Sequence, residues 1–262
     1  MPHRAVYGPI MLMTPNHLRR IWGLQPKRVL HVGAHLAEEA EMYSEADWGQ
    51  EVVVWVEADP EVCSTLIERT RGFHNHFVLN ALAWSESGRE VAFNRANNGE
   101  SSSVFEFADH TKEYPHISMT DSVSLATLAL QDAPLVQRTA PFDFINLDVQ
   151  GAELAALQGM SQLLPRAQWV YTEVSFRELY RGAPQFEEMR DFLTKIGFQL
   201  VDLARTRRGW GDSLWLNGEA PTWTRIRRNR RRLLSASDRA RKLPRTIAGR
   251  SSSRLIRRRA GS

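Results

Sequence analysis

The chain has 262 residues, of which 42% are hydrophobic and 24% are charged. This length and apolar content suffice for one substantial core, so we expect one folded domain with an appended segment. The single cysteine, Cys63, excludes an intrachain disulfide framework and a zinc site built on cysteines. No apolar run reaches the roughly 20 residues that span a bilayer, and the N-terminus lacks a signal-peptide pattern. We therefore expect a cytoplasmic protein without a transmembrane segment.

Charge is distributed unevenly along the chain. The formal net charge is +4, but residues 225–262 carry 15 basic side chains against the single acidic residue Asp238. The remaining 224 residues carry 19 basic and 29 acidic side chains. Because few apolar residues lie among these arginines, we expect 225–262 to be a disordered tail that contacts nucleic acid or an anionic membrane. The acidic remainder would attract a cationic ligand.

Between a lead-in segment (1–27) and this tail, a domain is expected over residues 28–224. Its first half predicts strands at 28–32, 52–56 and 77–79, with helices at 36–45 and from Pro60 onward. Its second half predicts strands at 90–94, 142–147, 169–171, 198–203 and 213–216, a polar loop at 97–103, and helices at 152–164 and 186–196. This alternation indicates an α/β fold with a mostly parallel sheet and helices on both faces. Ligands bind such sheets beyond the carboxyl ends of the strands.

Two neighbouring strand ends carry the residues of a nucleotide-type site. Gly33 directly follows the first strand, where a residue without a Cβ atom either lets a ligand approach or simply permits a tight connection. The second strand runs into Glu57, 24 positions after Gly33. A carboxylate at this place can accept hydrogen bonds from both ribose hydroxyls. Capping of the next helix is the alternative, and it suits Asp59, which immediately precedes Pro60.

The glycine pattern argues against a dinucleotide. The Gly-x-Gly-x-x-Gly motif admits a pyrophosphate, but here only its first glycine is present, and His35 and Leu36 occupy the phosphate approach. S-adenosylmethionine fits better, because it combines a ribose for Glu57 with a cationic sulfonium for an acidic domain. A nicotinamide-dependent oxidoreductase remains the alternative enzyme. The alternative without catalysis is an inactive binding module that acts through its basic tail.

Four sequence blocks resemble one enzyme family. They read LHVGAH (30–35), VWVEADP (54–60), SSS (101–103) and INLDVQGAEL (145–154), with further likeness at 170–174 and 209–212. In this order and spacing they resemble the FkbM family of S-adenosylmethionine-dependent methyltransferases over residues 28–216. The resemblance implies a Rossmann-like methyltransferase fold with a terminal antiparallel strand. It also implies methyl transfer to a hydroxyl of a sugar, glycan or natural-product acceptor.

The resemblance also implies the cofactor-binding residues, which are Gly33, Ala34, His35, Glu57, Ala58, Asn80 and Ala81. Two positions depart from the family's pattern. His31 stands where many methyltransferases carry an acidic residue two positions before the glycine, which bears on the contact to the methionine ammonium. Ala37 stands in place of a later glycine.

The expected catalytic residues are Asp148 and Glu173, each at the end of an apolar strand. Asp148 would orient the acceptor hydroxyl and accept its proton, while positioning supplies most of the rate. The two carboxylates are too few ligands to predict a divalent metal ion. Glu153, in the first turn of the next helix, suits capping as well as function.

Histidines and tryptophans complete the candidate residues. His31 and His35 are four positions apart, as in a zinc helix, but they flank a strand-to-loop turn, so no zinc site is expected. His35 either borders the cofactor or is a solvated loop residue. Trp210, flanked by glycines, could stack on a sugar, whereas Trp215 lies within an apolar strand and suits the core.

Overall fold

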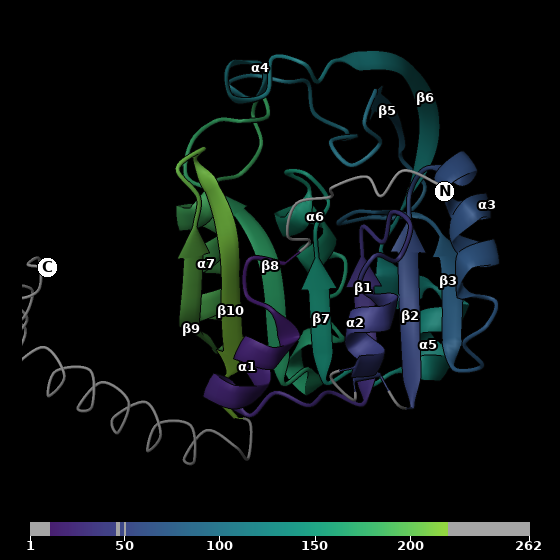
Figure 1. Cartoon of the computed structure of the whole chain (residues 1–262), viewed down its shortest axis with the longest axis vertical. Helices are drawn as coiled ribbons and strands as arrows, with labels where there is room; N and C mark the ends of the chain where they lie inside the picture. The colour runs from purple at the N-terminus through teal and green to yellow at the C-terminus, as the bar shows by residue number, and fades with distance from the viewer. Residues whose placement is uncertain (1–10, 46–47, 50, 220–262) are drawn as a thin grey trace, which may run out of the picture. The chain divides into compact units, whose positions relative to one another are not determined.

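The computed structural model describes residues 11–45, 48–49 and 51–219 (Figure 1). The predicted Arg-rich tail, 225–262, and its proposed contacts with nucleic acid or a membrane lie outside the described residues. No helix among the described residues is both long and apolar enough to cross a membrane.

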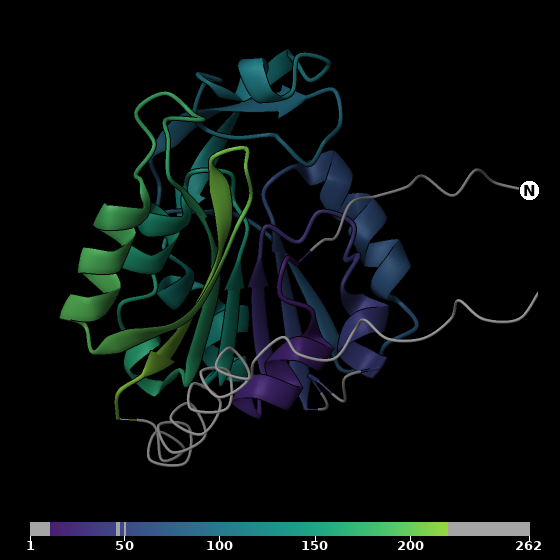
Figure 2. The same cartoon turned by 60° about the vertical axis from the view of Figure 1, so that its left-hand side comes forward.

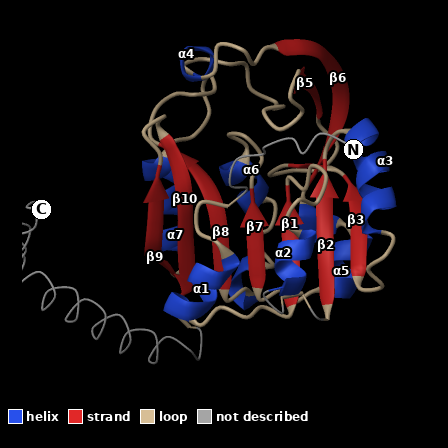
Figure 3. Cartoon of the chain, in the orientation of Figure 1, coloured by secondary structure: helices blue, strands red, loops and turns tan. Residues whose placement is uncertain are grey.

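A seven-stranded sheet forms the centre of the domain (Figures 1 and 3). Its spatial order is β3-β2-β1-β7-β8-β10-β9. The strands are β1 (Arg28–Val32), β2 (Val52–Glu57), β3 (His76–Asn80), β7 (Phe144–Leu147), β8 (Trp169–Ser175), β9 (Phe198–Arg205) and β10 (Trp210–Asn217). β10 is antiparallel to both β8 and β9, whereas β1 pairs in parallel with β2 and β7. The predicted Rossmann-like fold with a terminal antiparallel strand is confirmed.

Helices cover both faces of this sheet (Figures 1 and 2). One face carries α1 (Pro15–Trp22), α2 (Ala40–Glu45) and α3 (Pro60–Thr70), and the other carries α5 (Pro134–Thr139), α6 (Glu153–Gln158) and α7 (Phe186–Lys195). Because both faces are covered, every residue of β2 and β7 is buried. Trp215 is fully buried in the core, as its position within an apolar strand predicted.

Two predicted helices are too long. The helix expected over 36–45 begins only at Ala40, because His35 and Ala37 adopt positive φ values of 42° and 53° that an α-helix does not allow. The helix expected over 152–164 ends at Gln158 and is followed by turns and a short 3-10 helix, η2 (Leu164–Arg166). Gly159 ends it where the chain passes close to another segment, since an added Cβ would lie 1.8 Å from the carbonyl oxygen of Trp84.

A second, three-stranded sheet lies beyond the carboxyl ends of β1 and β2 (Figure 1). It contains β4 (Leu82–Ala83), β5 (Glu90–Ala96) and β6 (Met119–Leu128) in the spatial order β4-β6-β5. In the chain, α4 (His110–Glu113) lies between β5 and β6, and a short 3-10 helix, η1 (Leu130–Asp132), follows β6. Only β5 is predicted by the sequence pattern. β6 is mostly exposed or half-buried, so it lacks the apolar run that marks a central strand.

The segment before β1 is part of the packed domain. Thr14 caps α1 by accepting a hydrogen bond from the His17 amide (3.3 Å), and Leu18 is fully buried. The Trp22 indole nitrogen donates to Asp202 of β9 (2.7 Å), and the Leu12 amide donates to Asp212 of β10 (2.7 Å). These bonds attach residues 11–27, which were predicted as a lead-in segment, to β9 and β10 at one edge of the sheet.

Candidate active site

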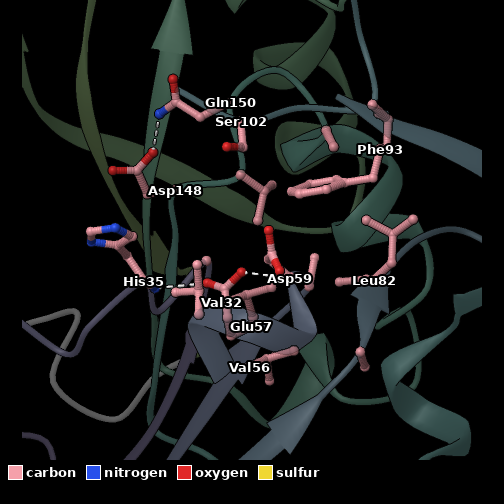
Figure 4. A pocket seen from close by; sticks show the side chains of 18 of the residues that line it. Val32, His35, Val56, Glu57, Asp59, Leu82, Phe93, Ser102, Asp148 and Gln150 are labelled. Carbon is pink, nitrogen blue, oxygen red and sulfur yellow. Dashed lines mark hydrogen bonds between the residues drawn. The ribbon is translucent and has the colours of Figure 1, made fainter. Parts of the chain in front are cut away.

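Two adjoining cavities lie at the carboxyl ends of the parallel strands. The first lies between the ends of β1, β2 and β7 and the three-stranded sheet (Figure 4). The second lies between the loop after β1, the end of β8, and the segments around residues 98–117 and 206–210. Five residues line both cavities: Gly33, His35, Glu100, Asp148 and Gln150. The sheet edge predicted to bind ligands is therefore where the cavities are.

Gly33 is required by a close contact between two backbone segments. Its φ is +86°, and an added Cβ would lie 1.7 Å from the carbonyl oxygen of Asp148. The amides of Gly33 and Ala34 both donate to the carbonyl of Val56, at 2.9 and 3.0 Å. The tight connection after β1 is therefore enough to explain a glycine at position 33. The backbone contact between Gly33 and Asp148 also brings Asp148 to the cavity.

Glu57 connects the two loops that border the first cavity. One carboxylate oxygen accepts from the Asp59 amide and the other from the His35 amide, both at 2.8 Å (Figure 4). Glu57 is 8% exposed, and burial raises its pKa to about 7. Asp59 caps α3 by accepting from the Glu61 amide (2.9 Å), as its position before Pro60 suggested.

The remaining predicted cofactor residues are placed differently. Ala58 and Ala81 line the first cavity, and Ala34 lines the second. Asn80 lines neither of these two cavities: its side-chain amide donates to the carbonyls of Glu57 (2.8 Å) and Ala58 (3.0 Å). Asn80 thus fixes β3 against the loop after β2.

The three-stranded sheet adds a wall that sequence reasoning missed. Phe93 of β5 and Leu82 of β4 point into the first cavity (Figure 4). Arg95 of β5 forms a bidentate ion pair with Asp59, at 2.7 and 2.9 Å, and also reaches Asp121. This pair joins the small sheet to the N-terminus of α3. The sequence shows Arg95 as one arginine in a polar strand, with no signal of its partner.

Asp148 follows β7 and lies where the cavities meet. One of its oxygens accepts from the side-chain amide of Gln150 (2.5 Å), whose own oxygen accepts from the Tyr180 hydroxyl (2.6 Å). Burial raises the pKa of Asp148 to about 6, although the hydrogen bond from Gln150 lowers it. These bonds fix one carboxylate oxygen of Asp148, and the other accepts no hydrogen bond from the described residues.

Glu173 of β8 lines the second cavity with Asp148, as predicted. Burial and the nearby charges of Asp148 and Glu153 raise the pKa of Glu173 well above its ordinary range. Glu153 accepts hydrogen bonds from the amides of Val149 (2.9 Å) and Gly151 (3.0 Å). It therefore stabilises the turn between β7 and α6, which agrees with the capping interpretation. The described residues contain no group of three side chains that could hold a metal ion.

The two histidines of the first loop lie in different environments. His31 is 2% exposed inside the domain, and its Nδ1 lies 3.0 Å from the Tyr43 hydroxyl. Burial lowers the pKa of His31 to about 3. His35 lines both cavities, and its Nδ1 lies 2.9 Å from a carboxylate oxygen of Glu38. They do not form a common zinc site.

Aromatic side chains also line the second cavity. Trp210 donates its indole N–H to the Tyr114 hydroxyl (2.8 Å), and Tyr180 lies beside them on the cavity wall. His110 is 4% exposed and stacks on Phe107 at 4.1 Å between centroids. Its buried Nδ1 has no hydrogen-bond partner within the described part of the chain.

The sequence of this chain is similar to those of known methyltransferases. The sequence model of the Methyltransferase FkbM domain matches residues 31–200. The 2-O-methyltransferase NoeI of Sinorhizobium fredii is 32% identical over 152 residues, which cover 55% of this chain and 61% of that protein. The match thus spans less than two thirds of this relative.

Solved structures with the same kind of fold are more distant. The methyltransferase FkbM of Methylobacillus flagellatus is 15% identical with a TM-score of 0.49, and the alignment covers 77% of this chain and 50% of that one. A SAM-dependent methyltransferase of Aquifex aeolicus is 14% identical with a TM-score of 0.44, covering 79% of this chain and 90% of that one.

The family match extends from β1 into β9 and contains all the predicted cofactor-binding and catalytic residues. It decides between the two enzyme classes that the glycine pattern left open, in favour of methyl transfer over nicotinamide chemistry. The chain therefore belongs to the FkbM methyltransferase family, and S-adenosylmethionine is its cofactor.

Proposed function

We propose that this protein transfers a methyl group from S-adenosylmethionine to a hydroxyl group of a sugar, glycan or natural-product acceptor. The observation that carries the proposal is the position of Asp148, which lines both cavities. A side chain at this junction can face a cofactor on one side and an acceptor on the other. The name of the relative NoeI, a 2-O-methyltransferase, supports oxygen as the methylated atom.

The first cavity fits the nucleoside part of the cofactor. Its polar side is the Glu57 carboxylate, suited to ribose hydroxyls, and Ala58 and Ala81 leave room for close approach. Its apolar side is formed by Leu82 and Phe93, suited to the faces of an adenine ring. When bound, the cofactor supplies an electrophilic methyl group on a sulfonium.

Asp148 has the properties of a proton acceptor for the hydroxyl. Its carboxylate oxygen Oδ1 is occupied by Gln150, so Oδ2 remains to orient an acceptor hydroxyl and take its proton. A pKa of about 6 leaves most of Asp148 ionised at neutral pH and makes it a stronger base than an ordinary aspartate. Alignment of the hydroxyl with the methyl group supplies the larger part of the rate.

The second cavity suits a sugar ring. Trp210 offers an aromatic face for the apolar side of a ring, and its hydrogen bond to the Tyr114 hydroxyl fixes its orientation. The guanidinium of Arg208 lies over the Tyr114 ring, 4.5 Å from its centroid, and is a further donor on this cavity. Asn98 and Glu173 on the same cavity offer polar groups to sugar hydroxyls. This combination of an aromatic face and carboxylates is the reason for placing a carbohydrate-like acceptor there.

Methyl transfer to purified carbohydrates tests the proposal. The full-length protein is incubated with methyl-labelled S-adenosylmethionine and a panel of mono- and oligosaccharides, and labelled products are isolated. An O-methyl ether survives mild alkali, whereas a methyl ester is hydrolysed. We expect an alkali-stable product whose formation is lost in Asp148→Asn and kept in the matched surface variant Asp191→Asn. An alkali-labile product, or label on nitrogen, would contradict the proposal.

A further inference from the structure

We propose that the carboxylate of Glu39 binds the α-ammonium group of S-adenosylmethionine. It would take the role of the acidic residue that many methyltransferases carry at the position of His31. The inference rests on the cofactor lying at the junction of the two cavities, as in the proposed function. It assigns to this chain a cation-binding residue that lies six positions after Gly33, outside the motif positions that the sequence pattern singles out.

His31 cannot take this role. Its side chain lies within the core, where its ring packs against Trp55 at 4.9 Å and its Nδ1 contacts the Tyr43 hydroxyl. It lines neither of the two cavities, and burial lowers its pKa to about 3, which leaves it uncharged at neutral pH. His31 therefore offers the cofactor neither a negative charge nor a reachable atom.

Glu39 is a buried carboxylate that, among the described residues, has no hydrogen-bond donor from another residue. It is 5% exposed and lines the second cavity together with Gly33 and Ala34. Within the described part of the chain, the hydrogen bond to its carboxylate comes from its own backbone amide. Burial raises the pKa of this carboxyl group to about 8, so a cation bound beside it would be needed to keep it ionised at neutral pH.

Neighbouring carboxylates already have donors. Glu38 accepts from the Leu36 amide (3.1 Å) and contacts the His35 ring (2.9 Å). Asp212 accepts from the Leu12 amide (2.7 Å) and from the Tyr171 hydroxyl. Glu39 differs from them because, within the described residues, its carboxylate accepts a hydrogen bond only from its own backbone amide. The negative charge of these neighbours adds to the attraction for a cation.

The position of Glu39 points to the amino-acid end of the cofactor. The two cavities meet at Gly33, and the first of them has the polar and apolar walls for the nucleoside. The part of the cofactor beyond the nucleoside carries the sulfonium and the ammonium, and Glu39 lies on the second cavity, past Gly33. An ammonium group supplies up to three donors, which matches a carboxylate that lacks them.

Binding of two product analogues separates this role from a general effect of charge. S-adenosylhomocysteine contains the ammonium group, whereas methylthioadenosine contains the same nucleoside and a sulfur without the amino acid. By isothermal titration, we expect Glu39→Gln to weaken S-adenosylhomocysteine binding by about tenfold or more, and to leave methylthioadenosine binding within about twofold. Glu41→Gln, which changes an exposed residue of α2, serves as the control and should change neither.

The stability of the ligand-free protein gives a second measurement. If Glu39 had a structural role, Glu39→Gln would lower the melting temperature. Because the carboxylate is buried without a partner, we expect the variant to melt at the same or a higher temperature than the parent protein. A lower melting temperature with unchanged binding of S-adenosylhomocysteine would overturn the proposal.

The parent protein alone also provides a test, so the proposal does not depend on a variant that folds. The deaminated analogue of S-adenosylhomocysteine should bind about tenfold more weakly than the parent ligand. Equal affinities would refute the role of Glu39 while leaving the methyltransferase proposal intact. Failure of both ligands and of methylthioadenosine to bind would instead refute the placement of the cofactor on which both proposals rest.

Discussion

Gly33 and Asp148 meet backbone to backbone at the junction of the two cavities: a Cβ atom on residue 33 would lie 1.7 Å from the carbonyl oxygen of Asp148. This contact joins the loop after β1 to the loop after β7, and the Asp148 amide donates to the Val32 carbonyl (2.9 Å) beside it. The residue proposed as the proton acceptor is therefore held in place by the same glycine that opens the cofactor loop.

Replacement of this glycine should destabilise the fold. Gly33→Ala would place a methyl group on rigid backbone atoms and force a side chain into a φ of +86°. We expect the free energy of unfolding to fall by about 2 kcal/mol or more in urea denaturation. Gly72→Ala is the control, since nothing lies within 4 Å of its added Cβ. Equal stability of the two variants would contradict the requirement for glycine at position 33.

Glu57 should contribute to cofactor affinity through its carboxylate. Glu57→Gln keeps the shape of the side chain but replaces one acceptor oxygen with an amide nitrogen, so one of the amides of Asp59 and His35 loses its partner. We expect S-adenosylhomocysteine to bind about tenfold more weakly in calorimetry. Glu68→Gln, an exposed residue of α3, should bind as the parent protein does. Undiminished binding by Glu57→Gln would remove Glu57 from the cofactor site.

Arg95 should hold the wall of the first cavity in place. Arg95→Ala removes the bidentate pair with Asp59 that joins the three-stranded sheet to α3. We expect weaker binding of both S-adenosylhomocysteine and methylthioadenosine, because the wall faces the nucleoside. Arg89→Ala removes an arginine from a solvent-exposed pair in the same region and is the control. A loss confined to S-adenosylhomocysteine would show that Arg95 acts elsewhere.

The sequence predicted the parts of the fold whose signal is local. β2 and β7 are fully buried and β1 is buried after Arg28, so these strands appear as nearly continuous apolar runs, and Gly33 and Glu57 stand at the ends of such runs. β6 escaped prediction because most of its residues are exposed or half-buried. α1 is different, because it carries local helix signals that the prediction did not use: Thr14 as N-cap, Pro15 in the first turn and Gly23 as C-cap.

The parts of the site that escaped prediction depend on contacts between distant segments. Arg95 and Asp59 are 36 positions apart and meet through the packing of the small sheet on α3. Glu39 is an ordinary acidic residue in the sequence, and only the fold buries it beside a cavity. Local pattern carries no information about such pairings or about burial of a charge.

The activity should depend on the ionisation of Asp148. Because the ionised carboxylate accepts the proton and its pKa is about 6, kcat/KM should fall as the pH is lowered through 6. The hydrogen bond from Gln150 lowers this pKa, so Gln150→Ala should move the fall in activity to higher pH. A pH–rate profile for each protein measures the shift. An unchanged profile in Gln150→Ala would show that Asp148 does not control it.

The ligand-free protein should become less stable between pH 7 and pH 9. The pKa of Glu39 is about 8 in the folded chain, against an ordinary value near 4.5, because of burial and the charges of Asp148, Glu38 and Asp212. Since the folded state then binds more protons than the unfolded state, the free energy of unfolding decreases as pH rises through this range. Glu57 and Glu153, each with a pKa of about 7, and Glu173 act in the same direction.

Histidines with lowered pKa values have the opposite effect, but only below about pH 7, where unfolded histidine binds protons. Two other groups act in the same direction as the carboxylates above pH 7: His35, whose pKa is raised by the hydrogen bond and charge of Glu38 although burial lowers it, and Cys63, whose pKa burial raises to about 11. Urea denaturation of the parent and Glu39→Gln proteins at pH 7, 8 and 9 therefore isolates the part due to Glu39 by difference. We expect Glu39→Gln to reduce the loss of stability, and Glu41→Gln to leave it unchanged. A saturating concentration of S-adenosylhomocysteine should also reduce the loss in the parent protein, because an ammonium beside Glu39 favours its ionised form. If the parent and Glu39→Gln proteins lose stability equally, Glu39 is not the titrating group.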